Sequence, residues 1–180
     1  MRQILSHEPH RSIIHMKKIK PFIIFITAAL VFVDLLTKAM AAASLKFQDF
    51  VIIKNVLVLH YLKNKGAAFS MLSGKGFVFL IVTPIIMAII IYFIIKLPDE
   101  RKFFALHFDL AVLLAGALGN FIDRVFLGYV RDFIYFEIID FPVFNFADIC
   151  VTLSVIYLFI LILFKYKDVD IMKAVHANKS

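Results

Sequence analysis

The sequence predicts an all-α membrane protein with four transmembrane helices, and three observations support this prediction. Hydrophobic residues make up 62% of the 180 residues and charged residues 18%, whereas a soluble domain carries about half apolar and about a quarter charged residues. Four segments are apolar over the roughly 20 residues that a helix needs to cross a bilayer. Most Lys and Arg residues flank these segments, as the topology rule for membrane proteins expects.

The expected spans are Phe22 to about Ala42, Gly76–Ile95, Phe103–Leu127 and Ala147–Phe164. The second span contains no charged residue, and its Pro84 is tolerable because neighbouring helices can satisfy the freed carbonyl. The first span, with the basic arm before it and Ala41–Ala43 after it, imitates a cleavable signal peptide. Asp34 and Lys38 follow its apolar run closely and three more spans come later, so an uncleaved span is favoured.

Four spans place both termini on one side of the membrane. That side carries twelve Lys and Arg residues and the other side six, which predicts cytoplasmic termini. Residues 1–20 are expected to form a cytoplasmic arm without fixed structure, residues 21–167 a single membrane domain, and residues 168–180 a cytoplasmic tail. Met16 is an alternative translation start to Met1. Between the first two spans, the β-branched and apolar run Val51–Tyr61 predicts strands at the outer membrane surface.

Ionisable and amide side chains gather near one end of these spans. With a rise of about 1.5 Å per residue, Asp34 lies roughly 18 Å into the first span and Asn120 roughly 25 Å into the third. A charge at mid-bilayer costs about 3 kcal/mol or more, so a cluster of such groups indicates a functional site. The five acidic and amide groups expected to converge on the outer boundary are Asp34, Asn120, Asp123, Asp132 and Asp148, with Arg124 at the same depth as Asp123 and Asn145 in the nearby Phe144–Asp148 segment.

Some of these groups also have structural explanations. Asp123 and Arg124 could compensate each other's charge, and Asp34 and Lys38, four residues apart, could form an ion pair that supports the site. Gly116 and Gly119 share a helix stripe with Asn120 and Asp123, which predicts close helix packing with hydrogen bonds across the interface. Asp109 stands apart on the inner side and is expected to be a snorkelling interfacial carboxylate.

Asp132 and Asp148 differ from the other carboxylates. Neither has a Lys or Arg at helical spacing, and a connection of 15 residues allows both to lie at one membrane face. Two close carboxylates in a low-dielectric site cannot easily both ionise, so one keeps a proton while the other activates water. This pattern suits amide hydrolysis without a metal or a covalent intermediate.

Other chemistries have weaker support. The sequence has no HExxH motif and no Cys/His cluster, which disfavours a zinc protease. Ser70 or Ser73 could form a Ser–Lys dyad with a lysine, but turn or cap serines are the favoured interpretation. Cys150 is expected to be a small buried hydrophobe.

Four segments together resemble the lipoprotein signal peptidase (signal peptidase II) family in order and spacing. They are Asp34–Lys38, Asn64–Ser70, Gly116–Ile134 and Phe144–Asp148. The resemblance implies a membrane aspartyl endopeptidase with a small β cradle and a loop over the active site on the outer face. It implies that Asp132 and Asp148 are catalytic, with site-supporting residues Asp34, Asn64, Asn120, Arg124 and Asn145; Asp123 is expected to belong with these.

The resemblance also implies an inner-membrane enzyme without a cofactor. Its substrates are prolipoproteins, cut before a diacylglyceryl-modified cysteine, and its further partners are membrane lipids and cyclic peptide inhibitors such as globomycin. Two alternatives stay open from the residues alone. One is a small proton-coupled transporter or channel, because intramembrane carboxylates also relay protons. The other is a non-enzymatic membrane partner in which the polar stripe holds helices together.

Overall fold

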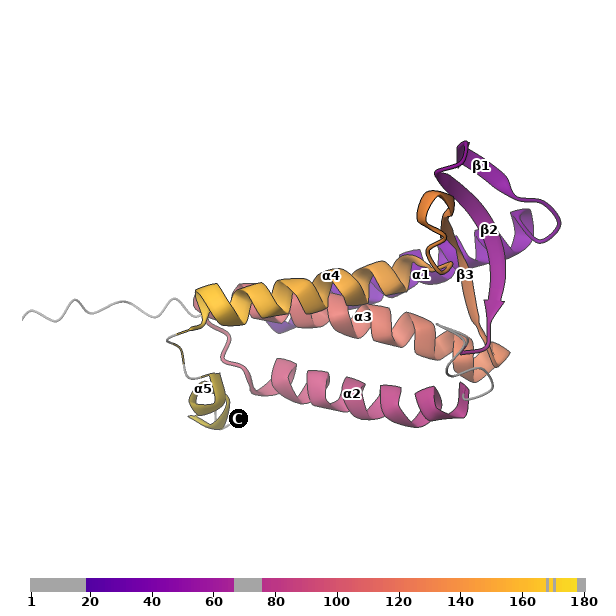
Figure 1. Cartoon of the computed structure of the whole chain (residues 1–180). Helices are drawn as coiled ribbons and strands as arrows, with labels where there is room; N and C mark the ends of the chain where they lie inside the picture. Colours follow the sequence, from indigo (N-terminus) through magenta and orange to yellow (C-terminus); the bar gives the residue numbers. More distant parts are fainter. Residues whose placement is uncertain (1–18, 67–75, 168, 170, 178–180) are drawn as a thin grey trace, which may run out of the picture.

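The computed structural model describes residues 19–66, 76–167, 169 and 171–177. Four long helices run side by side, a three-stranded sheet projects from one end of the bundle, and a short helix covers the other end (Figure 1). The elements in chain order are α1 (Ile19–Ser44), β1 (Phe50–Ile53), β2 (Leu57–Asn64), α2 (Gly76–Lys96), α3 (Phe104–Leu127), β3 (Val130–Phe136), α4 (Phe146–Ile160) and α5 (Ile171–Ala177), with a π-helical turn Leu161–Lys165 extending α4.

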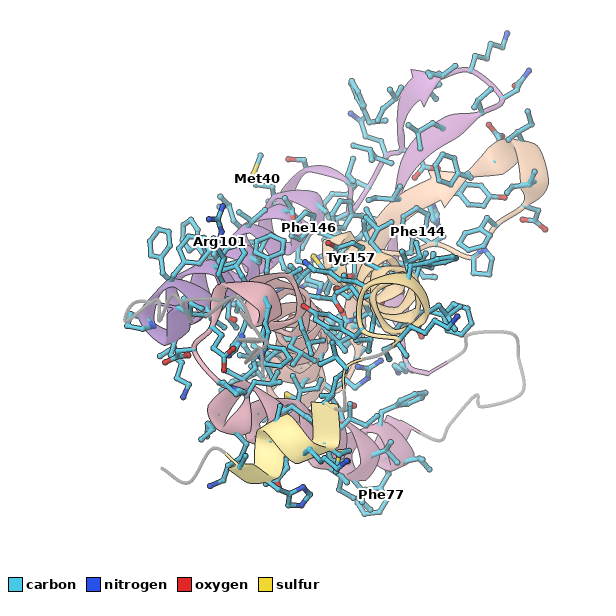
Figure 2. The ribbon with its side chains drawn as sticks, turned by 90° about the vertical axis from the view of Figure 1, so that its left-hand side faces the viewer. Met40, Phe77, Arg101, Phe144, Phe146 and Tyr157 are labelled. Carbon is cyan, nitrogen blue, oxygen red and sulfur yellow. The ribbon has the colours of Figure 1, made fainter. Side chains whose placement is uncertain are left out.

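The four expected spans are confirmed to within three residues at each end, apart from a π-helical last turn in the fourth. Each of the four helices is long and apolar enough to cross a membrane, and α2 continues through Pro84 without a break. Large apolar side chains project outward from the bundle, as Met40 and Phe77 do in Figure 2, where they are 59% and 71% exposed. Apolar surface on this scale requires a lipid cover. The chain is therefore a multi-pass membrane protein.

Helix α3 is the centre of the bundle and contacts α1, α2 and α4. Its two glycines make the closest contacts, as the stripe of small residues predicted. A Cβ atom at Gly116 would lie 2.6 Å from the Ala147 carbonyl oxygen, and one at Gly119 would collide with the Asp34 carboxylate. Only glycine lets α1 and the start of α4 come this close to α3, and that approach brings the polar groups of three helices together.

We expect Gly119→Ala to destabilise the protein by about 1–3 kcal/mol, because the added methyl overpacks a filled interface. The methyl would also push Asp34 away from α4. Thermal unfolding in detergent measures the effect, and Ala117→Ser on the same helix is the matched control. Equal unfolding temperatures for the two variants would contradict the packing argument.

The expectation for Asp109 is wrong. Its side chain is only 2% exposed, inside the bundle and close to the equally buried Ser154 of α4. Snorkelling requires a long side chain and a path to the interface. An aspartate is short, and α3 is covered by helices on several sides, so neither condition is met.

The sheet has the order β1-β2-β3 with antiparallel neighbours. The expected strands in Val51–Tyr61 are confirmed as the hairpin of β1 and β2. The third strand was not identified from the sequence, and it is the one that positions the site. Strand β3 follows α3 directly and pairs with β2, so that Asp132 lies opposite Leu62.

Some of the predictions concern residues that the structure does not describe, and others differ from the structure by only a few residues. Residues 1–18 and the Ala67–Ser70 part of the second resembling segment, together with Ser73, are not described by the structure. Helix α1 begins at Ile19, two residues before the expected domain boundary. Cys150 is buried at 6% exposure, which confirms its expected place in the core.

Candidate active site

Helix α4 begins with a reciprocal cap that fixes the position of Asp148. The Asn145 side-chain oxygen accepts from the Asp148 backbone N–H at 3.1 Å, and the Asp148 Oδ2 accepts from the Asn145 backbone N–H at 3.1 Å. An amide at the cap and a carboxylate three residues later form this box because both satisfy helix N–H groups that lack intrahelical partners. The sequence Asn145-Phe-Ala-Asp148 therefore determines locally where this carboxylate lies.

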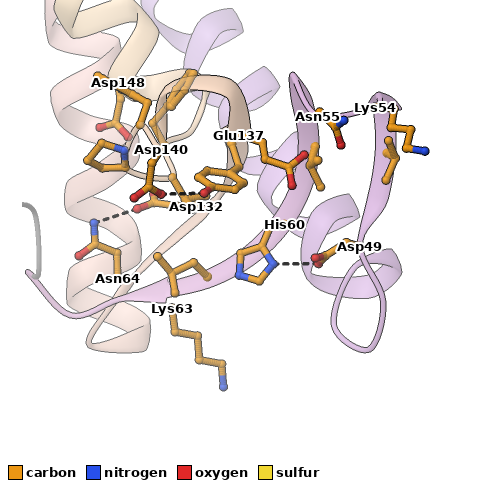
Figure 3. A pocket seen from close by; sticks show the side chains of 18 of the residues that line it. Asp49, Lys54, Asn55, His60, Lys63, Asn64, Asp132, Glu137, Asp140 and Asp148 are labelled. Carbon is orange, nitrogen blue, oxygen red and sulfur yellow. Dashed lines mark hydrogen bonds and ion pairs between the residues drawn. The ribbon is translucent and has the colours of Figure 1, made fainter.

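Asn145 also binds the second carboxylate. Its Nδ2 donates to Asp132 Oδ1 at 2.6 Å, so a single residue joins Asp132 and Asp148. Asn64 Nδ2 donates to the other oxygen of Asp132 at 2.8 Å (Figure 3). The Asn64 oxygen accepts from the Gly66 N–H at 2.8 Å. That turn holds the amide with its NH₂ group toward Asp132.

Asn120 supplies the matching donor for Asp148. Its Nδ2 donates to Asp148 Oδ1 at 2.7 Å, while its Oδ1 accepts from Lys38 Nζ at 2.9 Å and from Asn145 Nδ2 at 3.1 Å. Because an ammonium can only donate, Lys38 fixes which end of the Asn120 amide faces Asp148. The orientation of the catalytic candidate therefore depends on a residue on α1.

The Asp34–Lys38 pair expected from the sequence is confirmed. Lys38 Nζ lies 2.7 Å from Asp34 Oδ2, and both side chains are buried. The other oxygen of Asp34 accepts from the Ala147 backbone N–H at 2.9 Å. The pair thus connects α1 to the first turn of α4, directly beside Asp148.

Asp123 does not pair with Arg124, which corrects that alternative. Its carboxylate forms a two-pronged ion pair with Arg131, with 2.7 Å from Nη2 to Oδ1 and 3.0 Å from Nε to Oδ2. It also accepts from the Arg131 backbone N–H at 3.0 Å. Neighbouring residues of a helix point in different directions, so Arg124 instead lies over the Phe79 ring at 4.8 Å.

Arg131 is the site residue that the sequence analysis missed. It immediately precedes Asp132. Its backbone N–H and its guanidinium both donate to Asp123 on α3, which fixes the start of β3 and with it the Asp132 backbone. A signal was present in its position directly before a candidate catalytic aspartate. The acidic partner of Arg131 could not be chosen from the sequence, because Asp123, Asp132 and Glu137 all lie within eight residues of it.

Asp132 and Asp148 line the same groove, whose cavity has a volume of about 1070 Å³, and Asn64 and Arg124 line it with them. Four of the five acidic and amide groups expected to converge, all except Asp123, meet at or directly behind this groove, together with Arg124 and Asn145. Asp123 supports it through Arg131. Among the described residues, no three His, Cys, Asp or Glu side chains form a metal-binding cluster.

The groove favours the protonated form of Asp132. Burial raises the pKa of Asp132 from its ordinary 3.8 to about 6, and the nearby Asp148 charge acts in the same direction. The amide donors of Asn64 and Asn145 and the charge of Lys38 act in the opposite direction. Asp132 therefore keeps its proton to higher pH than an ordinary aspartate does.

Comparison with known proteins identifies one family. The family model described as "Signal peptidase (SPase) II" matches residues 26–164. The chain is 43% identical over 144 residues to a lipoprotein signal peptidase of Caldanaerobacter subterraneus subsp. tengcongensis, covering 79% of this chain and 96% of the relative. It is 40% identical over 149 residues to that of Lactococcus lactis subsp. cremoris, covering 82% and 96%.

The fold is also found among solved structures. A bacterial membrane enzyme determined at 2.3 Å resolution has a TM-score of 0.73 and 38% identity, covering 83% of this chain and 92% of that chain. A second, determined at 1.9 Å resolution, has a TM-score of 0.70 and 36% identity, covering 84% and 98%. With a family match over most of its length and a relative that is 43% identical, this chain belongs to the signal peptidase II family.

Proposed function

We propose that this chain is an aspartyl endopeptidase that removes the signal peptide from prolipoproteins, cleaving before the diacylglyceryl-modified cysteine. The observation that carries the catalytic assignment is the pair of hydrogen bonds by which Asn145 binds both Asp132 and Asp148. It holds two carboxylates side by side at one groove, where a water molecule can be bound between them. The comparisons support the protease class through the family, and the pair supplies the aspartic mechanism.

In the proposed reaction, the ionised Asp148 takes a proton from the attacking water while the protonated Asp132 donates to the scissile carbonyl oxygen. Oxygen of the water forms a bond to the carbonyl carbon, giving a tetrahedral intermediate. Its collapse breaks the C–N bond as the proton on Asp148 passes to the leaving amine and one hydroxyl of the intermediate returns its proton to Asp132, which restores both carboxyl groups. General acid–base catalysis of this kind contributes about 10²–10⁴-fold.

The supporting residues have separate roles in this proposal. Asn120 and Asn145 orient the carboxylates through their amide donors. Arg124 lines the groove beside both aspartates, where its guanidinium can hold a carbonyl of the substrate backbone. Lys38, Asp34, Asp123 and Arg131 form the buried charge network behind them.

The exposed apolar faces of the helices suit a lipidated, membrane-embedded substrate. The diacylglyceryl chains and the signal helix would lie against these faces, so much of the binding comes from burial of acyl surface. The proposal places the protein in the cytoplasmic (inner) membrane with both termini in the cytoplasm and the groove on the outer face. Globomycin-type cyclic peptides would compete for the same groove. Nothing in the family assignment supports the transporter alternative.

Incubation of the purified full chain with a diacylglyceryl-modified precursor tests the proposed function. Mass spectrometry of the products should give a mature chain that begins at the modified cysteine, and globomycin should block its formation. An intact precursor, or cleavage at another bond, would overturn the assignment.

The cleavage rate should fall as the pH rises above about 6, because Asp132, with its pKa raised by burial, then loses the shared proton. Asn64→Ala removes a donor that favours the charged carboxylate, so the pKa of Asp132 should rise further. The alkaline limb of the kcat/KM profile should therefore move to higher pH in this variant. Gln48→Ala, outside the groove, is the control. If the alkaline limb of the kcat/KM profile lay at the same pH in Asn64→Ala and in the control, this limb could not be assigned to Asp132.

A further inference from the structure

The groove is larger than cleavage of one peptide bond requires. Its cavity of about 1070 Å³ lies at the upper end of the roughly 300–1,000 Å³ that is usual for a small-molecule site. The two aspartates lie at one end only (Figure 3). The other end reaches the tip of the β1–β2 hairpin at Val51, Lys54 and Asn55.

The sheet forms the floor of this extension. Strand β2 contributes Val58, His60, Leu62 and Asn64 to the lining, although a bulge between Leu59 and Leu62 interrupts the simple alternation of the strand. Asn64 binds Asp132, so this row begins at the catalytic pair. The seven residues from Val58 to Asn64, six steps along the strand, cover about 20 Å. An extended peptide of about six residues has the same length.

The extension combines accessible apolar side chains with hydrogen-bonding groups. Val51 is 55% exposed and Leu62 is 40% exposed. Beside them lie the His60–Asp49 pair, at 2.8 Å, and the Tyr135–Asp140 hydrogen bond, at 2.7 Å (Figure 3). Apolar side chains interspersed with hydrogen-bonding groups suit a polypeptide, whose own side chains alternate with its polar backbone groups.

The direction of the groove identifies which part of the substrate fits. The sheet lies at one end of the bundle, and its strands cross the direction of the helices (Figure 1). A signal helix stays within the bilayer, so the chain that leaves the membrane after the scissile bond is the mature part. We infer that the sheet face from Asn64 to Val51 binds the first residues of the mature segment, about six of them after the cysteine. This inference rests on the proposed function and adds a binding site for the leaving side of the substrate.

A length series of precursors tests the inference. All carry the same signal peptide and modified cysteine, and their mature segments end one, three, six or ten residues after that cysteine. For the unmodified protein, kcat/KM should rise by about tenfold from the shortest to the six-residue substrate, equivalent to about 1.4 kcal/mol of added binding. It should then stay constant to ten residues.

Two variants locate the effect on the sheet. Val51→Trp fills the far end of the groove, and Ile52→Trp adds the same side chain to the next residue of β1, which does not line the groove. Both positions are exposed, and a strand tolerates tryptophan at either. Val51→Trp should abolish the rise with length while the one-residue precursor is cleaved normally, and Ile52→Trp should keep the rise.

The outcomes separate this inference from the proposed function. Equal kcat/KM for all lengths, or the same profile in Val51→Trp and Ile52→Trp, would overturn the sheet-face site while leaving the protease in place. No cleavage of any precursor by the unmodified protein would instead overturn the proposed function, and the mature-segment site with it.

Discussion

Replacing Lys38 by Met is expected to lower the free energy of unfolding by about 3–5 kcal/mol, the cost of leaving a buried charge without its partner. Lys38 is fully buried. Its ammonium lies 2.7 Å from Asp34, 2.9 Å from Asn120 and 4.0 Å from Asp123. Without it, the Asp34 carboxylate loses its counter-charge inside the bundle, and Asn120 loses the donor that orients its amide toward Asp148. Both stability and cleavage should therefore fall.

Thermal unfolding in detergent should show a decrease in Tm of about 10 °C for Lys38→Met. Lys102→Met is the matched control, because Lys102 makes an exposed ion pair with Glu100 that contributes little. Adding Asp34→Asn to Lys38→Met should recover part of the lost stability, since no unpaired carboxylate remains at Asp34. A Tm equal to that of the control, or a further loss in the double variant, would show that the buried network does not hold the helices as described.

The spans and the convergence of their polar groups could be predicted because both follow from simple geometry. A bilayer requires about 20 apolar residues per span, and the fixed rise of a helix gives the depth of each residue. Asp34 and Asn120 were therefore placed near the same end, where the structure joins them through Lys38. The glycine stripe on α3 also predicted where helices would come closest.

The predictions that failed concerned contacts between residues that are not adjacent in the sequence. Strand β3 has a run of aromatic and branched residues without alternation, and its pairing with β2 joins residues far apart in the sequence, such as Leu62 and Asp132. Asp123 has Arg124 next to it in sequence but Arg131 next to it in space, because the turn after α3 brings β3 back along the helix. Asp109 was misplaced because nothing local shows that other helices cover its side of α3.

Replacing either aspartate of the pair by asparagine should reduce kcat by about 10²–10⁴-fold or more, because an amide can neither accept the proton of the water nor donate an acidic one. The substitution keeps the shape of the side chain, and in Asp148→Asn the amide oxygen can still accept from the Asn145 backbone N–H. Insertion and Tm should therefore change much less than in Lys38→Met. The double variant should be little worse than either single variant, because residues that act as one unit are not additive.

Single-turnover cleavage of one diacylglyceryl-modified precursor by purified Asp132→Asn, Asp148→Asn and Asp140→Asn tests the catalytic pair most directly. Asp140 is an exposed carboxylate in the same groove, hydrogen-bonded to Tyr135, and it has no part in the proposed chemistry. The expected result is loss of cleavage in the first two variants and an unchanged rate in the third. Near-normal cleavage by either Asp132→Asn or Asp148→Asn would contradict a mechanism in which these two carboxylates share one proton and activate one water.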